Sequence, residues 1–171
     1  MFNHLSLNIM YRYIRSATYK LYHGSPNSSI VELDFDHIGK NTETHENFIF
    51  FTDSPEFAEE FSYERLPTSS KYLNAKGVKG RVYIAEVTLN HPLDLTSPTA
   101  DDIKNLIELS DGELTVDMID KFSRKNNQLL KAYIDLDRIV DYGYDGFIAK
   151  LNNSGAKEYA VISPEQIRFF K

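Results

Sequence analysis

The sequence contains no cysteine among its 171 residues. Disulfides, zinc–thiolate sites, iron–sulfur clusters and thiol nucleophiles are therefore excluded. Long apolar runs are also lacking, since charged or turn residues interrupt every stretch before it reaches the roughly 18 residues that a membrane-spanning helix needs. We therefore expect a chain without a membrane partner.

Common sequence motifs of enzymes are missing as well. The chain has no Gly-rich phosphate loop of the Walker or Rossmann type, no HExxH metal motif and no GxSxG elbow. We expect no metal site. The net charge of −6 argues against a protein held on nucleic acid by charge alone. The 42% hydrophobic content, with 11 Phe and 11 Tyr, is enough to support a folded core.

The first 31 residues contain no Asp or Glu, so all 25 acidic residues come after Val31. A basic segment of this kind is compatible with a transit peptide, a membrane-surface helix or an arm docked on the domain. The segment contains no continuous apolar stretch followed by a small-residue cleavage site, so we do not expect a secretory signal. We predict an N-terminal arm at residues 1–17, followed by one domain at residues 18–171.

Residue patterns in the rest of the chain predict strands early and late with helices between them. Apolar and β-branched runs predict strands at residues 18–23, 48–51, 81–89, 147–150 and 158–162, with a bulge or a face switch near Ala85. Apolar spacing and capping residues predict helices at residues 55–62, 101–109, 113–122 and 127–140, and residues 66–80 are expected to form a loop. Asp53 or Ser54 is expected to cap the first helix. This order favours an α+β fold with a helical block at about residues 100–141.

Four short motifs occur in one order along the chain: LYHGS at residues 21–25, FFTDSPEFA at 50–58, GYDGFI at 143–148, and EYAVI at 158–162 followed by Gln166 and Ile167. Together they resemble the ADP-ribosyltransferase superfamily, in its clade defined by a His, an aromatic residue and a Glu. The chain is similar to the compact bacterial and phage members found in polyvalent proteins. The matching positions are His23, Phe50 and Glu158.

The resemblance implies NAD as the substrate, with transfer of ADP-ribose to an acceptor. Glu158 and His23 are then the catalytic residues. Glu158 would stabilise an oxocarbenium-like transition state, and His23 would hydrogen-bond a ribose hydroxyl of NAD.

The same resemblance assigns the NAD contacts to His23, Gly24 and Ser25, with the Gly24 backbone on the nicotinamide amide. Phe50 and Phe51 would supply an apolar wall, although one of them is expected in the core because neighbours on a strand face opposite sides. Tyr63 or Phe61 is the expected second wall.

The implied fold has split antiparallel sheets around an NAD cleft, with the helical block as an insert. The implied role is that of a bacterial or phage effector or toxin in the cytoplasm of a bacterium or an infected host cell. Its partners would be a macromolecular acceptor, protein rather than nucleic acid, and a neutralising antitoxin or immunity protein. Ala156, two residues before Glu158, departs from the pattern of arginine-directed transferases, so arginine is not supported as the acceptor residue.

Two alternatives remain open at this stage. One is a non-catalytic module that binds NAD or a partner in the same cleft. The other is an NAD glycohydrolase, which transfers ADP-ribose to water. Taken singly, His23 also fits a structural histidine and Glu158 an ordinary solvated strand residue.

Overall fold

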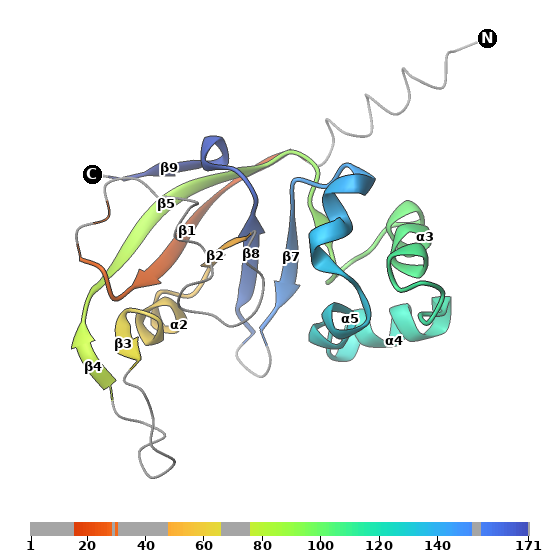
Figure 1. The fold of residues 1–171 in the computed structure, drawn as a ribbon, viewed down its shortest axis with the longest axis horizontal. Helices are drawn as coiled ribbons and strands as arrows, with labels where there is room; N and C mark the ends of the chain where they lie inside the picture. Colours follow the sequence, from red (N-terminus) through yellow and green to blue (C-terminus); the bar gives the residue numbers. More distant parts are fainter. Residues whose placement is uncertain (1–15, 29, 31–47, 66–75, 152–154, 171) are drawn as a thin grey trace.

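The computed structural model of the chain describes residues 16–28, 30, 48–65, 76–151 and 155–170. Residues 1–15 of the predicted arm and residues 66–75 of the predicted loop lie outside this set. The first strand begins at Ala17. Figure 1 shows a curved sheet with a group of helices beside one of its ends.

The main sheet has seven strands in the order β6-β7-β8-β2-β1-β5-β9. The strands are β1 Ala17–Ser25, β2 Ile49–Thr52, β5 Arg81–Leu89, β6 Leu93–Asp94, β7 Gly146–Lys150, β8 Lys157–Val161 and β9 Ile167–Phe169. Strands β6 and β7 run parallel, and the other neighbours are antiparallel. Strands β3 (Tyr63–Arg65) and β4 (Lys76–Lys79) form a separate two-stranded sheet. The predicted α+β class is confirmed.

The main sheet consists of two halves that are joined at a narrow point. Strands β1 and β2 share one register pair, Tyr22 with Thr52, whereas β1 and β5 pair over nine residues and β2 and β8 over four. The halves are thus β6-β7-β8-β2 and β1-β5-β9. This arrangement supports the predicted division into two halves, which here belong to one hydrogen-bonded sheet.

Helices occupy two regions of the fold. They are α2 Pro55–Glu60, α3 Ala100–Leu109, α4 Val116–Lys125 and α5 Gln128–Tyr133, with short 3-10 helices η2 Leu136–Tyr142 and η3 Pro164–Gln166. Helix α2 starts where the sequence predicts, because the Ser54 hydroxyl accepts a hydrogen bond from the Phe57 amide at 3.1 Å and Pro55 occupies the first turn. None of the helices among the described residues is both long and apolar enough to cross a membrane.

The two faces of the sheet bury two hydrophobic clusters. Strand alternation in β2 sends Phe50 toward one cluster and Ile49 and Phe51 toward the other. The first cluster includes buried leucines and isoleucines of α3, α4, α5 and η2, which pack on Phe147 of β7. The helical block is therefore packed against the β7 end of the sheet, as Figure 1 shows.

Three details of the expected secondary structure are wrong. The predicted helix at 127–140 is broken, because Ile134 is extended and Asp135 caps a new 3-10 helix. The predicted bulge or face switch near Ala85 is absent, since β1 and β5 keep one register throughout and every second residue from Tyr83 to Leu89 is buried. Part of the predicted loop at 66–80 is strand β4.

Candidate functional site

His23 lies near the end of β1, and its imidazole is fixed by the backbone of β2. Nδ1 is 2.8 Å from the carbonyl oxygen of Phe50. Because a carbonyl only accepts, Nδ1 carries the proton, and Nε2 of the neutral ring is left as an acceptor. Burial lowers the pKa of His23, and the hydrogen bond to the Phe50 carbonyl opposes this shift. His23 is therefore neutral near pH 7, with Nε2 as its acceptor nitrogen.

Phe50 and Phe51 lie on opposite faces of β2. The Phe51 ring is 2% exposed and contacts the His23 ring at a centroid distance of 5.4 Å. The Phe50 ring packs edge-on against Phe147 at 6.0 Å, on the face covered by the helical block. Phe51 is thus a core residue that supports His23, and Phe50 belongs to the other face.

Glu158 lies on β8, and its carboxylate points to the helical block. Oε1 accepts hydrogen bonds from Nε2 of Gln128 at 2.9 Å and from Nζ of Lys131 at 2.5 Å. The side chains of Lys131 and Glu158 are only 16% and 12% exposed. A carboxylate this enclosed keeps its charge at low cost only when it is paired, as it is here.

The three residues picked out by the sequence lie near one another on three neighbouring strands. Glu158 is the register partner of Thr52, and Thr52 is the partner of Tyr22, the residue before His23. Their side chains are not all brought together, however. Phe50 and Glu158 share a face and flank the Lys131 ammonium, which is 5.9 Å from the Phe50 ring centroid. His23 packs on Phe51 and reaches the other two only through the Phe50 carbonyl.

Gly24 and Ser25 have evident structural roles at the end of β1. A Cβ on Gly24 would lie 1.8 Å from the carbonyl oxygen of Ala58, so only glycine allows α2 to approach β1. Ser25 is buried, and its hydroxyl accepts a hydrogen bond from the Asn27 amide at 3.2 Å. Both residues shape the turn that follows His23.

Tyr63 belongs to the small sheet, where Lys79 is its register partner and holds its ammonium 5.5 Å from the ring centroid. Phe61 contacts Phe57 at 5.2 Å and is 38% exposed. Neither of these contacts involves His23 or Phe50. The second aromatic wall stays a prediction.

Gln128 and Lys131 are the residues at this site that the sequence did not single out. They lie three positions apart on α5, so they share one helix face. The only sequence signal was a lysine inside the apolar stretch LLKAY at residues 129–133. A lysine in such a stretch is equally typical of a solvent-exposed side chain, because no local pattern indicates an acidic partner 27 residues later.

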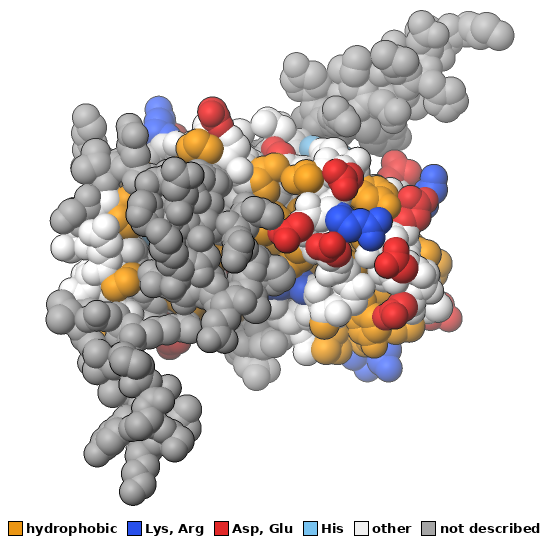
Figure 2. Space-filling model, viewed as in Figure 1, with side chains coloured by type: hydrophobic (Ala, Val, Ile, Leu, Met, Phe, Trp, Pro, Cys, Tyr) orange, Lys and Arg blue, Asp and Glu red, His pale blue; other side chains and the backbone are white. Residues whose placement is uncertain are grey.

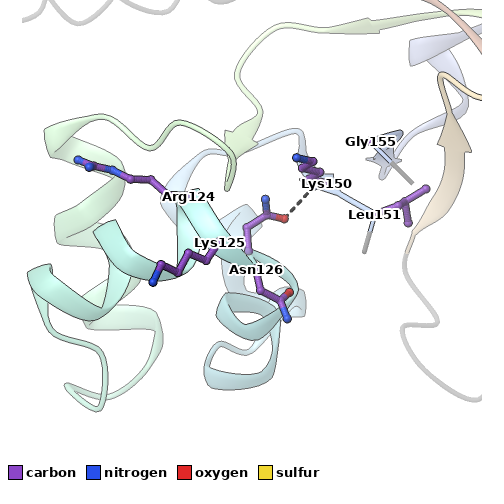
Figure 3. Close-up of a pocket in the computed structure, with 7 residues that line it drawn as sticks. Arg124, Lys125, Asn126, Lys150, Leu151 and Gly155 are labelled. Carbon is purple, nitrogen blue, oxygen red and sulfur yellow. Dashed lines mark hydrogen bonds between the residues drawn. The ribbon is translucent and has the colours of Figure 1, made fainter. Parts of the chain in front are cut away.

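A separate hollow of about 420 Å³ lies between the end of α4 and the end of β7. Its lining residues are Arg124, Lys125, Asn126, Asn127, Lys150, Leu151 and Gly155, shown in Figure 3. The dashed line there joins the Asn127 side-chain oxygen to the Lys150 amide, 2.8 Å apart. His23, Phe50 and Glu158 do not line this hollow.

The mixed sheet flanked by helices is consistent with an ADP-ribosyltransferase fold. The chain belongs to the family described as ADP-ribosyltransferase in polyvalent proteins, whose family model matches residues 17–170. This membership confirms the resemblance to the ADP-ribosyltransferases of polyvalent proteins and supports ADP-ribosylation, with NAD as substrate, as the general activity.

Two further comparisons add little about activity. No curated protein matches the chain significantly. Among solved structures, it is similar to one described as the crystal structure of an anti-CRISPR protein, with 13% identity and a TM-score of 0.45 over 90% of this chain and 96% of that one. That likeness is too low to carry an argument about function.

Proposed function

We propose that this protein transfers ADP-ribose from NAD to a macromolecular acceptor and releases nicotinamide. Family membership supports the general reaction. The observation that carries the assignment of the site is the placement of Glu158, an enclosed carboxylate on β8 whose register neighbours are Thr52 on β2 and, beyond it, Tyr22 on β1, the residue before His23. The His, aromatic and Glu positions expected for this clade thus come from three adjacent strands.

The reaction breaks the bond between the anomeric carbon of the nicotinamide ribose and the pyridinium nitrogen. The bonding electron pair goes to that nitrogen, so nicotinamide leaves as a neutral molecule. The acceptor nucleophile forms a new bond to the anomeric carbon and gives up its proton to solvent. Positive charge develops on the ribose in the transition state, and the Glu158 carboxylate stabilises it because opposite charges interact strongly in a partly enclosed site.

His23 orients the substrate in this proposal. Its neutral ring offers Nε2 as an acceptor for a ribose hydroxyl, because Nδ1 is engaged with the Phe50 carbonyl. The backbone of Gly24 and the turn at Ser25 would bind the nicotinamide amide, and Tyr63 would contact its ring. Phe51 contributes by supporting the His23 ring from the core.

The acceptor is proposed to be a protein, and the role that of a bacterial or phage effector or toxin in the cytoplasm of a bacterium or an infected host cell. Figure 2 shows acidic side chains spread over the helical block, with fewer basic ones. A surface of this sign repels the phosphates of a nucleic acid. An antitoxin or immunity protein that neutralises the enzyme is a further expected partner.

The experiment that tests this proposal measures the release of nicotinamide and the transfer of labelled ADP-ribose in the same reaction. The full chain and its Glu158→Gln variant are incubated with NAD labelled in the ADP-ribose part and a bacterial lysate. Glu165→Gln is the matched control, because Glu165 is an exposed acid on η3 in the same C-terminal region. We expect nicotinamide release and labelled protein from the wild type and the control, and neither from Glu158→Gln.

Other outcomes would redirect the assignment. Nicotinamide release without a labelled macromolecule would indicate an NAD glycohydrolase. Label on nucleic acid would correct the acceptor class. Equal turnover by Glu158→Gln would remove Glu158 from the site, and NAD binding without any turnover would favour a binding module.

A further inference from the structure

The first turn of α5 is docked on the ends of β7 and β8 by several hydrogen bonds. The Asn127 side-chain oxygen, just before the helix, accepts from the Lys150 amide at 2.8 Å. Nε2 of Gln128 donates to the Lys150 carbonyl at 2.9 Å and also to the Glu158 carboxylate. Asn127 is 2% exposed, so this junction is enclosed. The helical block is therefore attached to the strand that carries the candidate catalytic acid.

Gln128 and Lys131 both bind the same oxygen of Glu158, Oε1. Among the described residues, no hydrogen bond or ion pair involves the other oxygen, Oε2. Oε2 is not fully enclosed either. Among the described residues, Asn126 Oδ1 is the one fully enclosed side-chain polar atom that lacks a hydrogen-bond partner. The carboxylate is thus held through one oxygen, while the other has no partner among the described residues.

Lys131 is itself held in place from two sides. Its ammonium lies 5.2 Å from the Phe147 ring centroid and 5.9 Å from that of Phe50, at cation–π distances. With only 16% of its side chain exposed, it has little freedom to leave Glu158. An ion pair this enclosed fixes the carboxylate rotamer far better than a solvated pair would.

We propose that Gln128 and Lys131 are positioning residues for Glu158, and that α5 is in this way part of the catalytic apparatus. They hold Oε1 so that Oε2 faces the ribose of the substrate, at the place where positive charge develops. This inference rests on the proposed function. It also gives the helical block a part in the reaction itself, beyond any part in choosing the acceptor.

The test compares the rate of nicotinamide release and the KM for NAD in four variants of the full chain. Lys131→Met keeps the length of the side chain and removes its charge, Lys131→Arg keeps the charge, and Gln128→Leu removes the second donor. Lys121→Met is the matched control, because Lys121 is an exposed lysine on α4 of the same block.

We expect Lys131→Met to lower kcat about 100-fold while KM changes little, because the carboxylate is misplaced and substrate contacts are kept. Gln128→Leu should lower kcat about tenfold, in line with the loss of one hydrogen bond to a charged group. Lys131→Arg should recover most of the loss, and Lys121→Met should match the wild type. Thermal melts of all variants separate these effects from unfolding, and if Lys131→Met does not melt cooperatively, Gln128→Leu decides.

Several results would overturn the inference. An unchanged kcat in Lys131→Met would show that the pair is only structural, and a higher kcat would show that Lys131 covers the site. A Lys131→Arg variant as inactive as Lys131→Met would also contradict it. If the wild type turns over NAD and Glu158→Gln does not, these results count against the positioning role alone. If the wild type does not turn over NAD, the proposed function and this inference fail together.

Discussion

His23 is kept neutral by its surroundings, and this has a measurable effect on stability. Its pKa in the folded protein lies below its ordinary value of 6.5, chiefly because of burial. The unfolded chain therefore takes up a proton at a higher pH than the folded protein does. The stabilisation is fully present above pH 6.5 and is lost as the pH falls below 6.5 through the lowered pKa.

Every other titrating group is common to the wild type and to His23→Gln. The difference between the unfolding free energies of the two proteins therefore isolates the contribution of His23. The free energy of unfolding of the wild type should fall relative to that of His23→Gln between about pH 7.5 and about pH 5. Urea denaturation at these two pH values measures it. A constant difference between the two proteins would show that His23 titrates normally.

Gly24 is required by the close approach of two backbones. We predict that Gly24→Ala lowers the free energy of unfolding by about 3 kcal/mol, because its Cβ would overlap the Ala58 carbonyl and push α2 away. Gly112→Ala is the comparison, since Gly112 has open space around it but a φ of 84°. It should cost about 1 kcal/mol from backbone strain. Denaturant unfolding checks both, and equal losses would rule out the overlap at Gly24.

At the scale of single elements, α3 begins with a capping box that is tied into the core. Asp102 is 1% exposed, and its Oδ2 accepts from the amide and hydroxyl of Thr99 at 2.8 and 2.9 Å. Its Oδ1 accepts from the Tyr144 hydroxyl at 2.8 Å. One carboxylate therefore caps the helix and joins it to the segment before β7.

We predict that Asp102→Ala lowers the free energy of unfolding by about 3 kcal/mol, because the buried Tyr144 hydroxyl and the Thr99 amide lose their acceptor. Asp101→Ala should cost less than about 0.5 kcal/mol, since Asp101 is exposed in the same turn. Urea denaturation of the two variants makes the comparison. A similar small loss in both would show that the cap is worth no more than a surface charge.

The break between α5 and η2 shows where element prediction from sequence fails. Residues 127–140 have helical apolar spacing and contain neither glycine nor proline. Ile134 and Leu136 are nevertheless both buried, at 7% and 1% exposure, and the extended Ile134 lets the chain change direction between them. Asp135 then caps η2 by accepting from the Asp137 amide at 3.1 Å. Tertiary burial outweighed local propensity here.

At the scale of the whole molecule, the family match and the first strand both begin at Ala17. We predict that a chain starting at Ser16 folds with a cooperative melt and a Tm within a few degrees of the full chain, since β1 keeps all of its nine pairs with β5. Differential scanning calorimetry of the two chains checks this. A broad or missing transition would mean that residues 1–15 are part of the core.

The sequence identifies the candidate site residues and their strands, but it does not give their relative orientation. Motif order identified His23, Phe50 and Glu158, and the strands that carry them were predicted from β-branched and aromatic runs. The roles of these residues stay predictions that the experiments above test. Their relative orientation depends on the pairing of β1, β2 and β8, which come from distant parts of the chain.

The sequence by itself determined the α+β class, the family, most strand positions and the N-terminal end of α2, because periodicity, capping and motif order are local properties of a chain. The tertiary structure alone decided that Phe51 supports His23 and that Lys131 and Gln128 hold Glu158. Those contacts join residues 27 to 30 positions apart through packing of separate elements. A long-range contact depends on how whole elements pack, and no local pattern encodes it.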